Sequence, residues 1–372
     1  MNNSIKSLRQ VLLCMLMLIC ASIHAQDRSA PGFVLTGNIS GAQDGARVVL
    51  VDIEGQKIID SALTQNGAFT LKGHVTEPTG CWIQCAGEYA IVQVENVAMT
   101  FKSPLKAMKL NYTAQGGREQ SLQNELNNLQ RSYESTYTSA LDSLNNKLYG
   151  SKEERARLIK IFNEAQDTYS DIYVAFGRRH IDSYLGLDIV YRNRKLISKD
   201  SVMLLYNNLP ETLKKTAKAN ALKIYASERL AQIGEQFTDF EVRSIQGEPF
   251  KLSDLKGKYI YLAFGSLYCG PCRKENKEIA KIYGTLRKQM NIVNFSLDLN
   301  RNDWEAAARE DGIVWYNVSD MMGTTGKIKT LYDVQGMPTS FLIDPKGVII
   351  ERFDGYQEEN IKKITSIVLK KE

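Results

Sequence analysis

Hydrophobic and polar positions follow three different rhythms along the chain, and the first is an alternation. From residue 32 to 117 apolar and polar residues alternate in short runs such as 33–39, and glycines interrupt the runs every few residues. A period of two is typical of strands that bury one face. The Asn66-Gly67 pair ahead of residues 68–71 is a tight-turn signal. The pattern therefore predicts a β-rich domain over 32–117, built as a small antiparallel sandwich or sheet.

The second rhythm covers residues 118–232, where apolar residues recur three and four positions apart. Leu122 and Leu126 show this spacing, and glycine and proline become rare. Ser151 followed by Glu154 is a capping-box signal for the start of a helix. We expect four to six helices here, forming an all-helical connecting or dimerisation region without catalytic residues.

The third rhythm, over residues 233–372, alternates continuous apolar runs with helical patterns. A final pair of apolar runs is separated by a Pro-Lys-Gly turn, and an amphipathic segment follows it. Such alternation predicts an α/β domain with a mixed central sheet flanked by helices. The predicted strands are 258–264, 292–297, 339–344 and 348–352, and the terminal helix is 358–370.

Residues 1–25 have the composition of a signal peptide. Lys6 and Arg9 precede the apolar run 11–20, and Ala25 closes a small-residue cleavage site. The run is short for a membrane span and no stop-transfer pattern follows it. We therefore expect a mature chain in the periplasm or cell envelope, without a transmembrane span.

A lipidated N-terminus at Cys20 is the alternative, although Ile19 is larger than the residue that normally precedes a lipidated cysteine. The chain has 47 Lys and Arg against 42 Asp and Glu. Removal of Lys6 and Arg9 with the leader gives 45 against 42, a net charge of +3. This small and scattered excess gives no reason to expect nucleic acid as a partner.

Six cysteines in 372 residues exclude a disulfide-dense scaffold. They fall in three pairs, which are Cys14 and Cys20, Cys81 and Cys85, and Cys269 and Cys272. On one strand Cys81 and Cys85 would lie about 13 Å apart, which is too far for a disulfide, whereas a turn between them would allow one. They are interpreted as buried core residues, with a redox relay to Cys269 as the sharper alternative.

The Cys269-Gly270-Pro271-Cys272 motif follows a predicted strand and begins a predicted helix. A cysteine at that position faces unpaired N–H groups and the positive end of the helix dipole, which favour its thiolate. Arg273 and Lys274 are expected to add positive charge. Cys272 lies one turn further on, more buried, within reach for a disulfide, and Pro271 fixes φ near the helix start.

This spacing predicts thiol–disulfide exchange. The Cys269 thiolate attacks a substrate disulfide, and Cys272 then resolves the mixed disulfide. The second attack requires a group that takes the proton of Cys272. Glu275, one turn after Cys272, is the candidate proton acceptor, and a solvent-exposed helix glutamate is the alternative.

Met337-Pro338 is expected to be a cis peptide bond, since X-Pro is the setting in which cis is accessible. Such a turn would present the Met337 backbone to an extended substrate and keep metal from bridging the two thiols.

Five segments in fixed order carry a family resemblance, and they are 233–240, 252–258, 269–272, 336–339 and 341–344. Over residues 233–372 the chain resembles the TlpA/ResA-like extracytoplasmic thiol–disulfide oxidoreductases of the thioredoxin superfamily. The front half loosely resembles the β-rich domain that precedes such modules in envelope proteins of Bacteroidota.

The resemblance implies a thioredoxin-like fold that uses Cys269 and Cys272 as a redox-active pair, with no cofactor and no metal. It implies protein thiols and disulfides as substrates and a membrane thiol reductant as electron donor, with cytochrome c apoprotein as one candidate substrate. Glu275 stands where relatives carry a functional glutamate. The residues implied in substrate binding are Tyr268, Gly270, Pro271, Met337 and Pro338.

Three positions depart from the family pattern or qualify it. Tyr268 stands where Trp is usual, so the substrate groove is expected to differ. Ala263 stands where plain thioredoxin has a buried aspartate, which leaves proton transfer to Glu275. The Gly270-Pro271 dipeptide is thioredoxin-like and favours a reductant, with a potential near about −270 mV.

Other classes of function remain open. A peroxiredoxin-like peroxidase has Ser266 in place, but Leu262 stands where its proline belongs. A zinc site formed by Cys269 and Cys272 would lack a second Cys or His pair nearby. A non-enzymatic envelope binding or assembly factor is the third alternative, because the β-rich and helical regions make up more than half of the chain.

Overall fold

The computed structural model describes residues 32–109 and 111–369. The leader, Cys14 and Cys20 lie outside the described residues. The chain divides into two compact units. One comprises residues up to Leu50 together with Ile59–Ser121, and the other comprises Val51–Ile58 together with the residues from Leu122 onwards.

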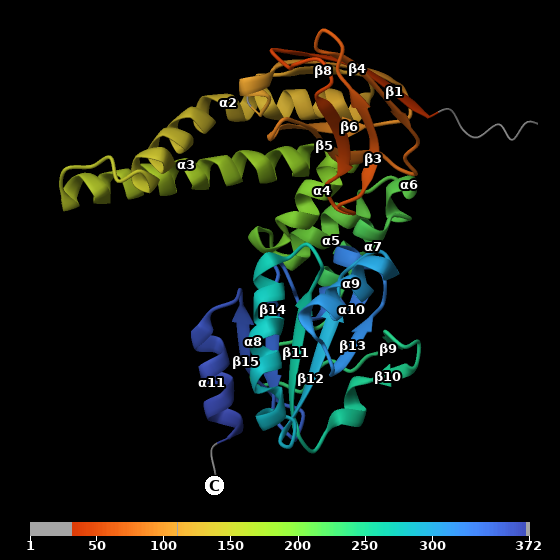
Figure 1. Cartoon of the computed structure of the whole chain (residues 1–372), viewed down its shortest axis with the longest axis vertical. Coiled ribbons are helices and arrows are strands. Elements are labelled where there is room, and N and C mark those ends of the chain that lie inside the picture. Colours follow the sequence, from red (N-terminus) through yellow and green to blue (C-terminus); the bar gives the residue numbers. More distant parts are fainter. Residues whose placement is uncertain (1–31, 110, 370–372) are drawn as a thin grey trace, which may run out of the picture. The chain divides into compact units, whose positions relative to one another are not determined.

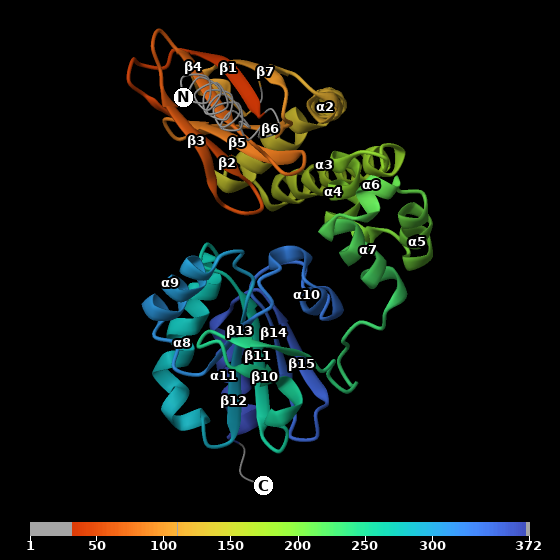
Figure 2. The ribbon, with the colours of Figure 1, turned by 90° about the vertical axis from the view of Figure 1, so that its right-hand side faces the viewer.

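The first unit contains two four-stranded sheets, with strand orders β4-β1-β7-β8 and β3-β2-β5-β6. Figure 2 shows these sheets as two layers in the red and orange part of the chain. Inward-facing residues of both sheets form one core, so the predicted β-rich domain is confirmed. The strands are β1 (Phe33–Ser40), β2 (Arg47–Asp52), β3 (Ile58–Leu63), β4 (Ala68–Gly73), β5 (Thr79–Cys85), β6 (Glu88–Val94), β7 (Ala98–Pro104) and β8 (Thr113–Gln115), with the 3₁₀ turn η2 (Leu105–Ala107).

The expectation of a purely antiparallel arrangement is wrong at one pair of strands. β1 pairs with β4 in antiparallel fashion and with β7 in parallel fashion, with Leu35 opposite Met99. A parallel neighbour requires a long crossover, and the chain makes it by building the second sheet between β1 and β7. Gly37 is required on β1, because a Cβ there would lie 2.2 Å from the ring of Phe69.

A helical region follows, as the spacing of its apolar residues predicted. Its helices are α2 (Arg118–Asn145), α3 (Lys152–Arg179), α4 (Tyr184–Arg192), α5 (Lys199–Asn207), α6 (Glu211–Lys214) and α7 (Ala217–Ser227), with η3 (Arg194–Leu196). Hydroxyl side chains begin four of them. Ser151, Ser183, Ser198 and Thr216 each accept the backbone N–H three residues on, which satisfies one free donor of the first turn. At Ser151 the capping box is incomplete, since the Glu154 carboxylate accepts the N–H of Gly150 instead.

The C-terminal part is a seven-stranded mixed sheet in the order β10-β9-β13-β12-β11-β14-β15. β11 runs parallel to β12 and antiparallel to β14, and it occupies a central place (Figure 1). The elements are β9 (Glu241–Ser244), β10 (Pro249–Lys251), η4 (Leu252–Leu255), β11 (Tyr259–Gly265), α8 (Gly270–Leu286), β12 (Met290–Ser296), α9 (Arg301–Asp311), β13 (Tyr316–Ser319), η5 (Gly323–Thr325), α10 (Lys327–Leu331), β14 (Thr339–Ile343), β15 (Ile349–Asp354) and α11 (Glu358–Val368).

β11 is buried on both faces, and its alternation sends neighbouring side chains to opposite cores. Ile260, Leu262 and Phe264 belong to the core that also contains η4 and α10. Tyr261 and Ala263 belong to the other core, together with residues of α8 and α11. Tyr261 and Ala263 therefore face the helix that begins at the cysteine motif. The predicted thioredoxin-like α/β fold with a mixed sheet is confirmed.

Candidate active site

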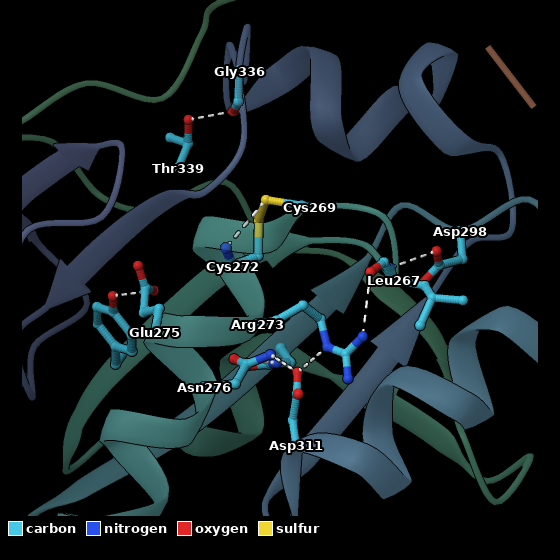
Figure 3. Close-up of a disulfide and its surroundings, with 12 residues drawn as sticks. Leu267, Cys269, Cys272, Arg273, Glu275, Asn276, Asp298, Asp311, Gly336 and Thr339 are labelled. Carbon is cyan, nitrogen blue, oxygen red and sulfur yellow. Dashed lines mark hydrogen bonds and ion pairs between the residues drawn. A yellow bond between two sulfur atoms is a disulfide. The ribbon is translucent and has the colours of Figure 1, made fainter. Parts of the chain in front are cut away.

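Cys269 and Cys272 form a disulfide at the N-terminus of α8, with their Cα atoms 5.2 Å apart (Figure 3). Cys269 is the N-cap residue, and its Sγ accepts the backbone N–H of Cys272 at 3.2 Å. Pro271 lies in the first turn, where its missing N–H removes no helical hydrogen bond. The sulfur of Cys269 thus occupies the position at which a helix stabilises negative charge.

The two cysteines differ in exposure in the predicted sense, with 8% of Cys269 and 3% of Cys272 accessible. Gly265, the last residue of β11, makes room for the inner one. A Cβ at Gly265 would lie 3.1 Å from Cβ of Cys272. The strand end and the first helical turn therefore pack closely enough to enclose the inner sulfur.

Both cations expected beside the motif have acidic partners, and Arg273 is the more closely paired of the two. Arg273 donates to Asp311 at 2.6 Å and to Glu310 at 3.0 Å, both on α9. The Lys274 ammonium lies 3.6 Å from the Glu358 carboxylate. Helix geometry, more than free cations, therefore stabilises a thiolate at this motif.

Glu275 is buried, with 2% of its surface exposed, so the exposed-glutamate alternative is wrong. Its carboxylate accepts a hydrogen bond from the Tyr261 hydroxyl at 2.6 Å, and Figure 3 shows Glu275 to the left of the disulfide. Burial raises the pKa of Glu275 to about 7, and the bond from Tyr261 acts in the opposite direction. A carboxyl group with this pKa exchanges protons readily near neutral pH.

Ala263 lines a small cavity behind the motif together with the Glu275 carboxyl group. It lies on the same face of β11 as Tyr261 and pairs in register with Ser340 of β14. A cavity of about 30 Å³ is lined by Ala263, Cys272 and Glu275, among other residues. The inner cysteine, Cys272, and the buried carboxyl group of Glu275 therefore line the same small cavity.

The loop before β14 carries the predicted proline turn. The Met337–Pro338 peptide bond is cis, which confirms the prediction, and Pro338 lines the same cavity as Cys272. The Thr339 hydroxyl donates to the Gly336 carbonyl at 2.8 Å and braces the turn. In Figure 3 Gly336 and Thr339 lie on the side of the disulfide opposite to Arg273 and Asp311.

Tyr268, directly before the motif, is 55% exposed. Its hydroxyl donates to Asp303 of α9 at 3.2 Å, so its ring is tethered beside the disulfide. Tyr268 thus supplies an exposed aromatic surface directly before the motif.

Sequence reasoning missed two buried aspartates that hold the site. Asp298 accepts the backbone N–H of Leu267 at 2.9 Å and so fixes the loop before Cys269, and burial raises the pKa of Asp298. Asp311 binds Arg273 and also accepts from Asn276 at 3.0 Å. Asp298 follows the end of strand β12, and functional residues gather at the carboxyl ends of parallel strands. Its position after a predicted strand was therefore the sequence signal that could have identified it.

Cys81 and Cys85 lie on the continuous strand β5, where both are buried and neither forms a disulfide. The alternative with a turn between them is therefore wrong, and the core interpretation is confirmed. Burial raises the pKa of the Cys85 thiol.

Among the described residues, no three His, Cys, Asp or Glu side chains gather as metal ligands. No helix in the described ranges is both long and apolar enough to cross a membrane.

Family models match two parts of the chain. Residues 233–352 match the AhpC/TSA family, and residues 33–123 match a domain of unknown function (DUF4369). A thiol–disulfide oxidoreductase ResA of Bacillus cereus is 31% identical over 148 residues, which cover 38% of this chain and 83% of that protein. ResA of Bacillus subtilis is 27% identical and is covered to 76%.

Solved structures of thiol–disulfide oxidoreductases are also similar. One from Bacteroides fragilis is 25% identical, with a TM-score of 0.34 and coverage of 36% of this chain and 99% of that one. The thioredoxin domain of one from Bacteroides vulgatus is 25% identical, with a TM-score of 0.35 and coverage of 37% and 98%. On the identity to ResA and the extent of ResA that it covers, this chain belongs to the ResA-like thiol–disulfide oxidoreductases of the thioredoxin superfamily.

Proposed function

We propose that this oxidoreductase reduces protein disulfides outside the cytoplasm, with Cys269 as the attacking thiol, Cys272 as the resolving thiol and Glu275 as the proton acceptor. The observation that carries the proposal is the redox pair at the start of α8 together with a buried carboxyl group one turn further on. That combination supplies an attacking thiol, a resolving thiol and a base within the first two turns of the helix.

The proposed exchange takes place in two steps. The Cys269 thiolate attacks one sulfur of a substrate disulfide, and the other substrate sulfur leaves as a thiolate and takes a proton from water. Cys272 gives its proton to the Glu275 carboxylate and attacks Cys269. The bond between Cys269 and the substrate breaks, and the second substrate sulfur leaves and is protonated. Two electrons pass to the substrate, and the enzyme is left with the disulfide between Cys269 and Cys272.

Two features favour a reductant over an oxidant. The Gly270-Pro271 dipeptide resembles that of thioredoxin, whose potential is about −270 mV. Strong oxidants stabilise their reduced thiolate, and the pairing of Arg273 with Asp311 and Glu310 removes a cation that would do so here.

An extended protein segment is the substrate that fits the surroundings of the pair. Tyr268 offers an exposed ring, and Gly270 leaves the approach to Cys269 open, since a Cβ there would meet no atom within 4 Å. The cis turn at Met337 and Pro338 supplies backbone groups on another side. Backbone pairing with modest side-chain selection suits an enzyme that acts on several proteins.

The place of action follows from the predicted leader over residues 1–25, which would deliver the chain to the periplasm or cell envelope. There the oxidised pair has to be recharged, so a membrane thiol reductant is the proposed electron donor. Cytochrome c apoprotein and wrongly oxidised envelope proteins are the candidate substrates.

The reduction potential of the Cys269–Cys272 pair tests the direction. It is measured by equilibrating the protein in dithiothreitol and glutathione redox buffers and counting thiols. We expect a value near or below about −250 mV, and a value above about −150 mV would make the protein an oxidant or isomerase.

A peroxidase is the second candidate, because the AhpC/TSA family model matches residues 233–352. Consumption of hydrogen peroxide by the reduced protein, compared with reduction of insulin by the same preparation, separates the two functions. We expect insulin reduction to predominate, because Leu262 stands where a peroxidase carries its proline.

A further inference from the structure

We propose that Tyr261 is a positioning residue for the exchange reaction, and that its hydroxyl, braced by Ser340, holds the Glu275 carboxylate beside Cys272 in its ionised form. This inference rests on the proposed function, in which Glu275 takes the proton of Cys272. It adds a residue whose side chain lies behind the redox pair and that the cysteine motif alone does not indicate.

Three side chains from three different elements meet at the Tyr261 hydroxyl. Tyr261 comes from β11, Glu275 from α8 and Ser340 from β14, and all three are at most 2% exposed. The hydroxyl lies 2.6 Å from Oε1 of Glu275 and 2.8 Å from Oγ of Ser340. Both distances are those of good hydrogen bonds between oxygen atoms.

A hydroxyl has one proton to donate, and this fixes the direction of the two hydrogen bonds for ionised and for protonated Glu275. When Glu275 is ionised, Tyr261 donates to the carboxylate and Ser340 donates to Tyr261. When Glu275 has taken a proton, the carboxyl group can donate to Tyr261, which then donates to Ser340. Both states keep the buried Tyr261 hydroxyl paired, so a proton can arrive at and leave Glu275 without leaving that hydroxyl unsatisfied.

A phenylalanine at position 261 would fill the core as well as the tyrosine ring does, so packing does not require the hydroxyl. The same strand already uses Phe264 as a buried ring, and burying an extra oxygen is unfavourable unless it is paired. In the part of the chain that the structure describes, the hydrogen bond recorded for the Glu275 carboxylate comes from Tyr261. The function of the Tyr261 hydroxyl is thus to donate a hydrogen bond to the Glu275 carboxylate.

The burial of Glu275 explains why its ionised form requires a stabilising hydrogen bond. Burial disfavours the ionised form of Glu275, and only that form can accept the proton of Cys272. A hydrogen bond to a charged acceptor is stronger than one to a neutral acceptor, so Tyr261 restores part of the lost stability of the ionised form. Loss of the hydroxyl therefore moves the titration of Glu275 to higher pH.

The test uses the full chain with Tyr261→Phe and follows the two steps of one turnover from pH 5 to pH 9. A peptide disulfide with a fluorescent leaving thiol reports the attack by Cys269, and release of the second peptide thiol reports the attack by Cys272. We expect the first step to be unchanged. The pH midpoint of the second step should rise by about one unit, because a charge-assisted hydrogen bond is lost, so that its rate near pH 6 falls about tenfold.

Three further variants make the result specific. Ser340→Ala should shift the midpoint in the same direction by less. Tyr259→Phe makes the same chemical change two residues earlier on β11 and should shift nothing. In a Glu275→Gln background, Tyr261→Phe should add no further change in the second step, because the group that it acts on is gone.

A readout independent of turnover is the titration of the Glu275 carboxyl carbon by NMR, which should show the same rise in Tyr261→Phe. Coinciding profiles of the wild type and Tyr261→Phe, or an equal effect of Tyr261→Phe in the Glu275→Gln background, would overturn the inference. Failure of the proposed function looks different, since the wild type would then release no peptide thiol at any pH.

Discussion

The chain has two described pairs of cysteines in two different regions, and only one of these pairs forms a disulfide. Cys81 and Cys85 lie four residues apart on strand β5, within the core of the first unit. Cys269 and Cys272 lie three residues apart at the start of α8 and form a disulfide. Local backbone geometry, more than the residue type, separates an inert thiol from a redox centre.

The comparison shows what the helix contributes. Burial raises the pKa of the Cys85 thiol, which disfavours the reactive thiolate form. The Cys269 sulfur instead accepts a backbone N–H of the first helical turn and retains a small exposed surface. Four changes test this contrast.

The largest effect is expected from Cys269→Ser, which removes the attacking sulfur. Reduction of insulin disulfides should fall to the rate of the protein-free control, because among the described residues no other cysteine caps a helix and retains accessible surface beyond 3%. Cys85→Ser, the same change in the other region, should retain the wild-type rate. Comparable losses in the two variants would show that both pairs take part in exchange and would revive the redox relay.

Cys272→Ser should keep the first attack and lose the second. The mixed disulfide between Cys269 and the substrate then has no resolving thiol, so covalent complexes with substrate proteins should accumulate. Non-reducing gel electrophoresis after acid quenching detects them, and dithiothreitol should release them. Cys81→Ser is the matched variant and should trap nothing. An absence of complexes from Cys272→Ser would contradict the proposed order of attack.

Glu275→Gln should change the pH dependence of stability. The carboxyl group has a pKa near 4.5 in the unfolded chain and about 7 in the fold, so both states are protonated at low pH. Between pH 4.5 and about 7 the unfolded chain ionises this group while the fold keeps it protonated, so stability falls by on the order of 3 kcal/mol and then levels off. Gln cannot ionise, so the variant should lose this decline.

Urea unfolding of the oxidised protein at pH 5 and pH 8 measures the effect. The control is Glu278→Gln, the same change at a half-exposed position of the same helix, and it should keep the wild-type dependence. A decline that is equally steep in Glu275→Gln would mean that another group is responsible.

Much of this site was predictable, because the redox motif is local in sequence. The spacing of Cys269 and Cys272 indicates a helix start and a closable disulfide, and the Met337-Pro338 dipeptide indicates the cis turn. Strand and helix rhythms also gave the three regions in the right order. These features depend on neighbours within a few residues, and local patterns record them.

What could not be predicted depends on contacts across the sheet. Tyr261 and Ser340 are 79 residues apart and meet only because β11 pairs with β14. The neutralisation of Arg273 requires α9 to pack against α8, with Asp311 38 residues away. The parallel pairing of β1 with β7 likewise reflects a crossover that alternation cannot reveal. Sequence patterns show which face of a strand or helix a residue lies on, whereas the topology of the sheet decides which distant residue it contacts.

The smallest effect is expected where the cysteines only fill space. Cys85→Ala should lower the free energy of unfolding by about 1–2 kcal/mol, because it leaves a gap in a close-packed core, while thiol exchange stays at the wild-type rate. Gln84→Ala, on the exposed face of the same strand, should change stability by less than about 0.5 kcal/mol.

Thiol counting in the oxidised protein completes this test. The thiols of Cys81 and Cys85 should react with a bulky reagent only after unfolding, since neither is more than 1% exposed in the fold. If they reacted in the native protein, or if Cys85→Ala altered the potential of the Cys269–Cys272 pair, burial would not be what separates the two pairs. The strand thiols would then belong to the redox chemistry, and the first unit would have to take part in the enzyme's cycle.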